Sequence, residues 1–143
     1  MDAALPPQSP AAAPALPAVY NLKRLGYLQE KVLGNSRGFV LSPLGSLKVF
    51  PLRVQMRRPY AWLPTGQWLV VFFDVPEQQR RIRDRLRAGL RHLGFSPLQR
   101  SVWATRRNVG KEVAELIALL GARSYVKPLL VHEYRQNQQK NSS

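Results

Sequence analysis

One acidic residue, Asp74, occupies a position where a carboxylate could act chemically rather than only solvate the surface. It directly follows the apolar run 68–73 and precedes Pro76 and Glu77, which are typical of a helix start. A carboxylate at the end of a buried strand can coordinate Mg²⁺ through one or two oxygens. It can equally cap the first turn of the following helix by accepting backbone N–H bonds. Both roles stay open for Asp74.

Any catalytic activity would depend on this one carboxylate, with Mg²⁺ as its cofactor. The chain has no cysteine, which excludes a thiol nucleophile, a zinc ribbon and a disulfide scaffold. The two histidines, His92 and His132, have no partner at metal-ligand spacing. No glycine-rich phosphate loop and no nucleophile elbow occurs. Asp74 is therefore the predicted metal ligand and the candidate catalytic residue.

The segment from Arg80 to Arg91 holds six arginines and a single acid, Asp84. Because compensating acids at the i to i+4 spacing are missing, these side chains repel one another unless an anion neutralises them. A solvated helix face is the alternative, and contact with a phosphate backbone is the favoured interpretation. Such contact releases counterions and makes binding steeply dependent on salt. The residues expected to bind nucleic acid here are Arg80, Arg81, Arg83, Arg87 and Arg91.

Basic side chains outside this segment complete the predicted nucleic-acid-binding set. Residues 51–66 combine arginines with Tyr60 and Trp62, which suits phosphate contact and base stacking, although an ordinary solvated linker is the alternative. The whole chain has 22 Lys or Arg against 8 Asp or Glu, a formal charge of +14. That excess predicts a polyanionic partner, nucleic acid before anionic lipid. The additional residues are Arg53, Arg57, Arg58, Arg106 and Arg107.

Residues 67–134 predict the fold that must position these side chains. A buried central strand at 68–73 is followed by an amphipathic helix that ends near residue 93. Two short strands, a second helix at 110–120 and a last strand at 125–134 follow. This order is the split βαβ arrangement, so we predict an α+β, ferredoxin-like antiparallel sheet with two helices on one face. A second copy of the chain is the simplest cover for the other face, which predicts a homodimer.

The N-terminal part is predicted to be a small basic appendage of that domain. A helix end closed by Gly26, a β-hairpin and a Ser-Pro-x-Gly helix start resemble the closing third of a winged-helix DNA-binding domain. The earlier helices of such a domain are not expected, because the preceding residues are rich in Pro and Ala. The predicted divisions are a disordered tail at 1–19, a wing-like remnant at 20–50, a basic linker at 51–66, the ferredoxin-like domain at 67–134 and a disordered tail at 135–143.

Nothing in the sequence predicts a membrane protein. No run of 18 apolar residues occurs, and the N-terminus lacks the basic and apolar regions of a signal peptide. The absence of cysteine favours the cytoplasm. We therefore predict a cytoplasmic protein without membrane contact.

Four motifs of the second half together resemble the Cas-two fold. They are the run Gly66 to Glu77, the arginine-rich Arg80 to Arg87, Leu93-Gly94-Phe95, and Leu98 to Trp103. This fold occurs in the small dimeric subunit of the CRISPR spacer-acquisition complex. It also forms the central domain of PaaX-like transcriptional repressors, where a winged helix precedes it. The resemblance covers residues 68–134 strongly and residues 22–49 weakly.

The two families imply different functions. In the CRISPR subunit, the Asp that ends the first strand is associated with metal-dependent nuclease activity in some members, and Asp74 matches it. The dimer there bridges integrase subunits of the Cas-one type and holds duplex DNA on a basic surface, a role that would fall on Arg80, Arg83 and Arg87. In PaaX-like repressors the winged helix reads DNA. We expect the CRISPR-type scaffold on duplex DNA, a Mg²⁺-dependent endonuclease if Asp74 is active, with a PaaX-like repressor as the alternative.

Overall fold

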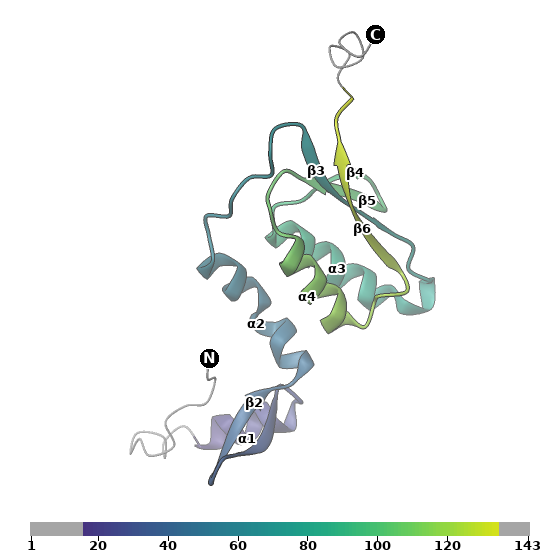
Figure 1. The fold of residues 1–143 in the computed structure, drawn as a ribbon. Helices are drawn as coiled ribbons and strands as arrows, with labels where there is room; N and C mark the ends of the chain where they lie inside the picture. Colours follow the sequence, from purple (N-terminus) through teal and green to yellow (C-terminus); the bar gives the residue numbers. More distant parts are fainter. Residues whose placement is uncertain (1–15, 135–143) are drawn as a thin grey trace. The chain divides into compact units, whose positions relative to one another are not determined.

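The computed structural model describes residues 16–134, so the predicted tail at 135–143 and most of the tail at 1–19 lie outside the described residues. The chain divides into two compact units, unit 1 (Met1–Pro51) and unit 2 (Leu52–Ser143). Their boundary falls inside helix α2 (Pro43–Met56) (Figure 1). In the part of the chain that is described, no helix is both long and apolar enough to cross a bilayer.

Unit 1 contains helix α1 (Leu16–Arg24) and a hairpin of strands β1 (Leu28–Leu33) and β2 (Ser36–Leu41). The predicted hairpin is confirmed, because β1 and β2 pair in antiparallel register along their whole length. Residues 16–19 are helical, so assigning them to a disordered tail is wrong. Pro17 lies in the first helical turn, where backbone N–H groups have no partner within the helix, so proline costs no hydrogen bond there. Leu16 and Ala18 beside it favour a helix.

Helix α2 begins where the sequence places a helix start. Ser42 Oγ accepts a hydrogen bond from the Gly45 backbone N–H at 3.0 Å, which caps the first turn. Pro43 occupies the first helical position, as is usual for proline. A Cβ atom at Gly45 would lie 2.1 Å from the Tyr27 carbonyl oxygen, so only glycine fits there. The Ser-Pro-x-Gly motif therefore docks α2 against the residue that precedes the hairpin.

The predicted linker at 51–66 is helical in its first part, because α2 runs through Pro51 to Met56. Proline removes one helical hydrogen bond, which favours an end at that point. Packing outweighs this loss: Val54 is 2% exposed, and Arg53 pairs with Glu115 of a distant helix. The irregular residues that follow the helix are tied to unit 2 by the bridge between Trp62 and Arg107.

Unit 2 has the predicted α+β, ferredoxin-like architecture. Its sheet has the strand order β4-β5-β3-β6 with every neighbouring pair antiparallel. The helices α3 and α4 lie on the same face of this sheet (Figure 1). The elements in chain order are β3 (Gln67–Phe73), the 3-10 turn η2 (Glu77–Gln79), α3 (Arg80–His92), β4 (Ser96–Gln99), β5 (Val102–Thr105), α4 (Gly110–Leu120) and β6 (Val126–His132).

The core of unit 2 lies between these helices and the sheet. Leu86 and Leu90 of α3 are both 0% exposed, as the helical spacing predicts. Val71 at the centre of β3 is also 0% exposed. A Cβ atom at Gly89 would lie 2.5 Å from a methyl carbon of Leu116, so the two helices approach each other closely at this glycine. The inner side of α3 is thereby fixed, and its outer side is left for contacts with solvent or a partner.

The opposite side of the sheet, which we call the open face, is covered by no helix of unit 2 (Figure 1). Side chains of a strand alternate between faces, and the register places alternate residues of three strands together on this side. Phe72, Leu129 and Val131 are 40%, 44% and 38% exposed. The open face consists of Trp68, Val70, Phe72, Val102, Ala104, Lys127, Leu129 and Val131.

Candidate nucleic-acid interface

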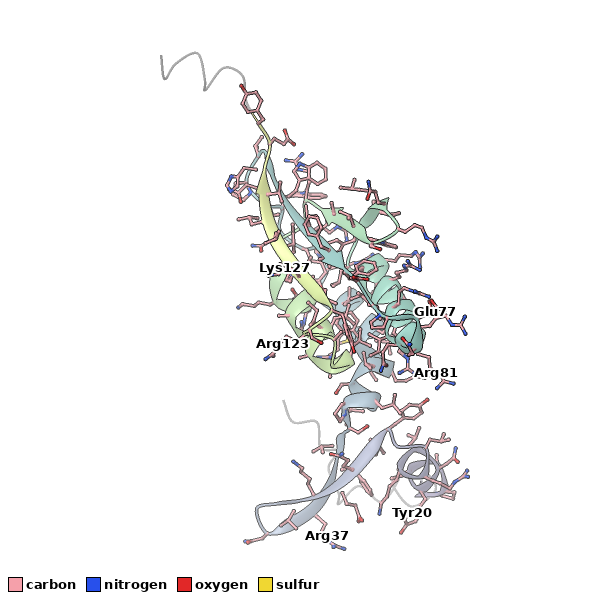
Figure 2. The ribbon with its side chains drawn as sticks, turned by 90° about the vertical axis from the view of Figure 1, so that its right-hand side faces the viewer. Tyr20, Arg37, Glu77, Arg81, Arg123 and Lys127 are labelled. Carbon is pink, nitrogen blue, oxygen red and sulfur yellow. The ribbon has the colours of Figure 1, made fainter. Side chains whose placement is uncertain are left out.

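The outer side of α3 presents two arginines whose guanidinium groups have no polar or ring partner in the described residues. Arg81 and Arg85 are both exposed, and neither forms a hydrogen bond, an ion pair or a ring contact within residues 16–134. Figure 2 shows Arg81 at the surface near Glu77. The helix has no acid in its first turn, and Arg91 and His92 stand in its last. These two guanidinium groups are therefore free to neutralise an external anion.

Two further arginines of this helix share one acid. Arg80 Nη1 lies 3.5 Å from Glu77 Oε2, and Arg83 Nη1 lies 3.3 Å from Glu77 Oε1. The side chains of Arg80 and Glu77 are each 69% exposed, so this pair is weak and easily replaced by contact with a phosphate. Arg83 is more enclosed, with 22% of its side chain exposed. One carboxylate between two guanidinium groups leaves the cluster with a net positive charge.

Arg87 and Arg91 lie against the protein surface. Arg87 donates a hydrogen bond to the Arg100 carbonyl oxygen at 3.2 Å, and its guanidinium stands 5.8 Å from the centre of the Phe73 ring. The guanidinium of Arg91 stands 5.0 Å from the centre of the Trp103 ring. Both groups keep their charge but are held in place by cation–π contacts. Arg87 and Arg91 are therefore held in place by contacts with the protein, unlike Arg81 and Arg85.

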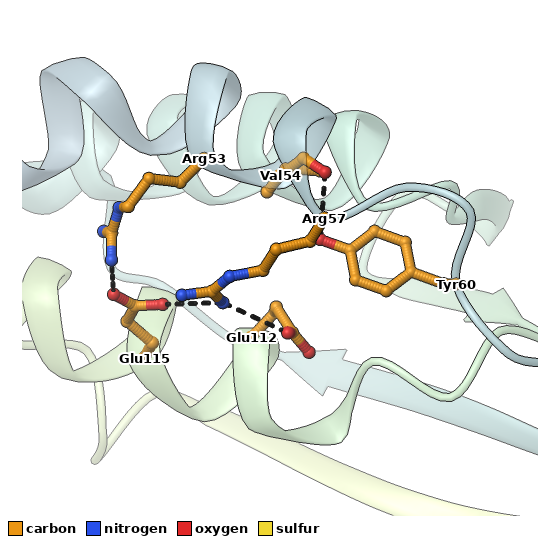
Figure 3. A network of polar contacts seen from close by, with 6 residues as sticks. All are labelled: Arg53, Val54, Arg57, Tyr60, Glu112 and Glu115. Carbon is orange, nitrogen blue, oxygen red and sulfur yellow. Dashed lines mark hydrogen bonds and ion pairs between the residues drawn. The ribbon is translucent and has the colours of Figure 1, made fainter. Parts of the chain in front are cut away.

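The arginines at the end of α2 have acidic partners within unit 2 (Figure 3). Arg53 Nη1 pairs with Glu115 Oε2, and Arg57 Nη1 pairs with Glu112 Oε2 at 3.1 Å. Only 13% of the Glu112 side chain is exposed. Two acids one helical turn apart on α4 thus neutralise Arg53 of α2 and Arg57, the residue that follows this helix. These contacts give Arg53 and Arg57 a structural role, and their predicted contact with nucleic acid stays a prediction.

Tyr60 completes this network. Its hydroxyl donates a hydrogen bond to the Val54 carbonyl oxygen at 3.1 Å (Figure 3). Burial raises the pKa of Tyr60, and the carboxylate of Glu112 raises it further, against smaller opposing effects of the nearby arginines. The hydroxyl therefore stays protonated as a donor. Its ring is half-buried and is committed to packing rather than to base stacking.

None of the remaining three predicted residues belongs to α3. Arg58 Nη2 donates to the His92 carbonyl oxygen at 3.0 Å. The guanidinium of Arg106 stands 5.7 Å from the centre of the Trp68 ring, which belongs to the open face. The guanidinium of Arg107 lies beside Gly94, where a Cβ atom would approach it to 2.7 Å. The ten predicted arginines therefore differ in their partners, and they do not form a single cluster with the same contacts.

Asp74 lies at the mouth of an open pocket of about 570 Å³. Its backbone N–H donates to the Tyr125 carbonyl oxygen at 2.9 Å, while its exposed carboxylate has no hydrogen-bond partner within residues 16–134. The capping alternative is wrong, because neither η2 nor α3 has a side-chain hydrogen bond at its N-cap. The helix proper begins at Arg80, after the 3-10 turn, which places it beyond the reach of Asp74.

The pocket is a poor magnesium site within one chain. Its lining includes the cations Arg123 and Lys127, both labelled in Figure 2, which oppose a metal ion beside Asp74. No group of three or more His, Cys, Asp or Glu side chains that could hold a metal occurs in the described part of the chain. A shared ion between the Asp74 residues of two copies would supply the missing ligand. The metal role of Asp74 stays a prediction.

Sequence reasoning assigned no binding residue to unit 1, although the hairpin carries exposed cations. Lys31 on β1 and Arg37 on β2 are both exposed, and Arg37 stands opposite Val32, the neighbour of Lys31. Lys23 at the end of α1 pairs with Glu30 at 2.6 Å, and this hydrogen bond lowers the pKa of Glu30. The wing-like pattern itself is the signal that could have identified Lys31 and Arg37, because a wing contacts phosphates through such residues.

Comparison with known proteins places unit 2 in a family. No curated protein and no solved structure matches the chain significantly. Residues 61–142, more than half of the chain, match the family described as the PaaX protein central Cas2-like domain. The match includes every strand and helix from β3 to β6, the ferredoxin-like sheet and its two helices. The chain therefore belongs to the family of the PaaX central Cas2-like domain.

Proposed function

We propose that this protein is a DNA-binding transcriptional regulator of the PaaX type. The observation that carries the proposal is the match of residues 61–142 to the PaaX central domain, directly after a basic helix-and-hairpin unit. This combination favours a regulator over the spacer-acquisition scaffold that the sequence alone led us to expect. In this proposal, unit 1 contacts the duplex, and unit 2 adds backbone contacts and joins two copies.

The hairpin of unit 1 supports the first part of the proposal. Lys31 and Arg37 are exposed on neighbouring strands; because Arg37 pairs with Val32, their side chains leave opposite faces of the hairpin, and each is available to a phosphate. The cap at Ser42 and the close approach of Gly45 to Tyr27 fix the base of the hairpin. A rigid hairpin with cations on its strands suits a wing that lies along the DNA backbone.

The outer side of α3 supports the second part. Arg81 and Arg85 have no partner among the described residues, and Glu77 neutralises only part of the charge of Arg80 and Arg83. Guanidinium groups on one helix suit phosphates rather than base edges, because a helix on a sheet presents a broad surface. This contact is independent of base sequence and weakens steeply with salt.

The open face supports self-association. Phe72, Leu129 and Val131 stand exposed together on a side of the sheet that no helix of unit 2 covers. An apolar sheet face is favourable only when it is covered, and a second copy of the chain supplies a complementary surface through a two-fold axis. A homodimer would also bring two basic units to one DNA duplex, as a two-fold symmetric operator requires.

A scaffold of the spacer-acquisition complex, with a Cas-one-type integrase subunit as partner, is the second candidate. The observation that favours it is the exposed carboxylate of Asp74, which has no hydrogen bond in the described residues and could join that of a second copy at one Mg²⁺. Cleavage of DNA in Mg²⁺ that is lost in Asp74→Ala and retained in Arg123→Ala would support this candidate. No cleavage by the wild type would remove its catalytic version.

Enrichment of duplexes from a random pool distinguishes the two candidates. A regulator enriches one sequence over successive rounds, whereas a backbone-binding scaffold enriches none. On the enriched duplex, Lys31→Ala with Arg37→Ala is expected to lower the affinity about 10-fold or more. Lys111→Ala removes an exposed cation of α4 and serves as the matched control. Unchanged affinity in the Lys31 and Arg37 double variant would contradict a wing that contacts DNA.

A further inference from the structure

Trp62 differs from the other two tryptophans of the chain in its exposure. It is 68% exposed, whereas Trp103 is 2% exposed and the half-buried Trp68 lies under the guanidinium of Arg106. A tryptophan stabilises a fold mainly through the large apolar area that it buries. Trp62 buries little of that area, so stability of unit 2 does not account for a tryptophan at this position.

The backbone on both sides of Trp62 is fixed. The Leu63 N–H donates to the Arg106 carbonyl oxygen at 2.7 Å, and the Asn108 N–H donates to the Ala61 carbonyl oxygen at 2.8 Å. Trp62 itself forms an antiparallel bridge with Arg107. The exposed Trp62 ring is therefore attached to a rigid backbone segment and not to a flexible loop. A partner that covers it does not have to order the chain first, which removes an entropic cost of binding.

The surroundings of Trp62 indicate the chemistry of that partner. Arg107 stands directly across the bridge, and Arg58 precedes Trp62 by a few residues. Cations beside an exposed aromatic face suit a ligand that combines a flat ring with negative charge.

The other aromatic side chain of the segment 51–66 is not available for the same role. Tyr60 is half-buried, and its hydroxyl is committed to the Val54 carbonyl oxygen. The stacking that the sequence suggested for this segment therefore falls on Trp62 alone. Nucleobases inside a duplex already stack on their neighbours, so an aromatic side chain gains most from a base that is unpaired.

We propose that Trp62 is a stacking platform for an unpaired base of a bound nucleic-acid strand, with its bridge partner Arg107 as the cation for a flanking phosphate. This inference deepens the proposed function and depends on nucleic-acid binding by the chain. Stacking on an aromatic side chain tolerates any base, so the site adds affinity for single-stranded or frayed segments without adding sequence preference.

Binding of labelled oligonucleotides to the full chain tests the inference. In Trp62→Ala, the affinity for oligothymidylate is expected to fall about 5- to 100-fold, while the affinity for a blunt duplex changes less than about twofold. Trp62→Phe keeps an aromatic face and should retain most of the affinity. Leu98→Ala is the matched control, because Leu98 is 65% exposed in the same unit. Oligothymidylate should quench tryptophan fluorescence in the wild type and much less in Trp62→Phe.

Oligouridylate forms a second arm of the experiment. A loss in Trp62→Ala with either oligonucleotide supports the inference, and the arm with the higher affinity identifies the strand as DNA or RNA. If the wild type binds a duplex but Trp62→Ala binds both oligonucleotides like the wild type, this inference fails and the proposed function stands. If Trp62→Ala weakens self-association in sedimentation and leaves both affinities unchanged, Trp62 belongs to a protein contact. If the wild type binds no nucleic acid, the proposed function fails first.

Discussion

The end of α2 and the outer side of α3 are both rich in arginine, but their guanidinium groups have different partners. At α2, Arg53 and Arg57 pair with Glu115 and Glu112 of α4. On α3, Arg81 and Arg85 form no hydrogen bond, ion pair or ring contact in the described residues. The number of arginines in a segment therefore does not locate an anion-binding surface. A carboxylate of the same chain can neutralise a guanidinium group, just as a bound phosphate can.

The difference follows from where the acids lie. Glu112 and Glu115 are three residues apart on α4, so they stand on one side of that helix and meet the end of α2. On the outer side of α3, Glu77 of the preceding turn is shared between Arg80 and Arg83, and the exposed Asp84 forms no ion pair within residues 16–134. We infer that α2 uses its arginines for stability and that α3 keeps its arginines for a partner.

The largest effect is expected when the inner side of α3 is compared with its outer side. Leu90→Ala should lower the free energy of unfolding by about 2 to 5 kcal/mol, because Leu90 is 0% exposed and its loss leaves a cavity. Arg85→Ala should change it by less than about 0.5 kcal/mol. Urea denaturation measures both. If both variants lost the same free energy of unfolding, Arg85 would have a structural role, and the inner and outer sides of α3 would not differ as expected.

Removing both free arginines of α3 should have the next largest effect. Arg81→Ala with Arg85→Ala is expected to lower the affinity for duplex DNA about 10- to 100-fold, since each lost phosphate contact removes one counterion-release step. The melting temperature should stay close to that of the wild type. Fluorescence anisotropy with a labelled duplex measures the affinity. Full affinity in this double variant would move the DNA contact away from α3.

A smaller effect is expected at the end of α2. Arg53→Ala should lower the free energy of unfolding by about 1 kcal/mol, because it leaves the partly enclosed carboxylate of Glu115 with only its longer pair to Arg57 at 3.9 Å. Duplex affinity should change less than about threefold. The double variant Arg53→Ala with Glu115→Ala should recover part of the stability, which a double-mutant cycle measures. If Arg53→Ala instead lost much of its duplex affinity and kept its stability, Arg53 would be a DNA contact and not a stabilising residue.

The smallest effect concerns pH and unit 1. The hydrogen bond and the charge of Lys23 hold the pKa of Glu30 below its ordinary value of 4.5 in the folded chain. The ionised form is therefore favoured by folding, and its contribution is present above pH 4.5 and is lost as pH falls through the lowered pKa. In thermal melting, the wild type should have a higher melting temperature than Glu30→Gln above pH 4.5. This difference should shrink as the pH falls through the lowered pKa of Glu30. A constant difference at all pH values would contradict the pair.

Local patterns predicted most of the fold, and contacts between distant residues account for the errors. The apolar run of β3, the leucine spacing of α3 and the hairpin of unit 1 are local signals, and all three are confirmed. Helix α2 continues past Pro51 because Val54 is buried and Arg53 meets Glu115, which lies far along the chain. No local pattern contains that contact.

The same limit applies to the candidate site. The predicted set contains five of the six arginines of α3 and omits Arg85, and the neutralisation of Arg53 and Arg57 depends on glutamates in another helix. Capping by Asp74 fails because a 3-10 turn separates this residue from α3. Trp62 was one of two aromatic candidates, and only the burial of Tyr60 distinguishes them.

The salt dependence of duplex binding tests the difference between α2 and α3 most directly. In a plot of log affinity against log salt concentration, the slope should fall in magnitude by about 1.8 in Arg81→Ala with Arg85→Ala, because two phosphate contacts are lost at about 0.9 each. Arg53→Ala with Arg57→Ala, measured at a temperature where it is folded, should keep the wild-type slope. An unchanged slope in the α3 variant, or an equal decrease in the α2 variant, would contradict the assignment of the DNA contact to α3.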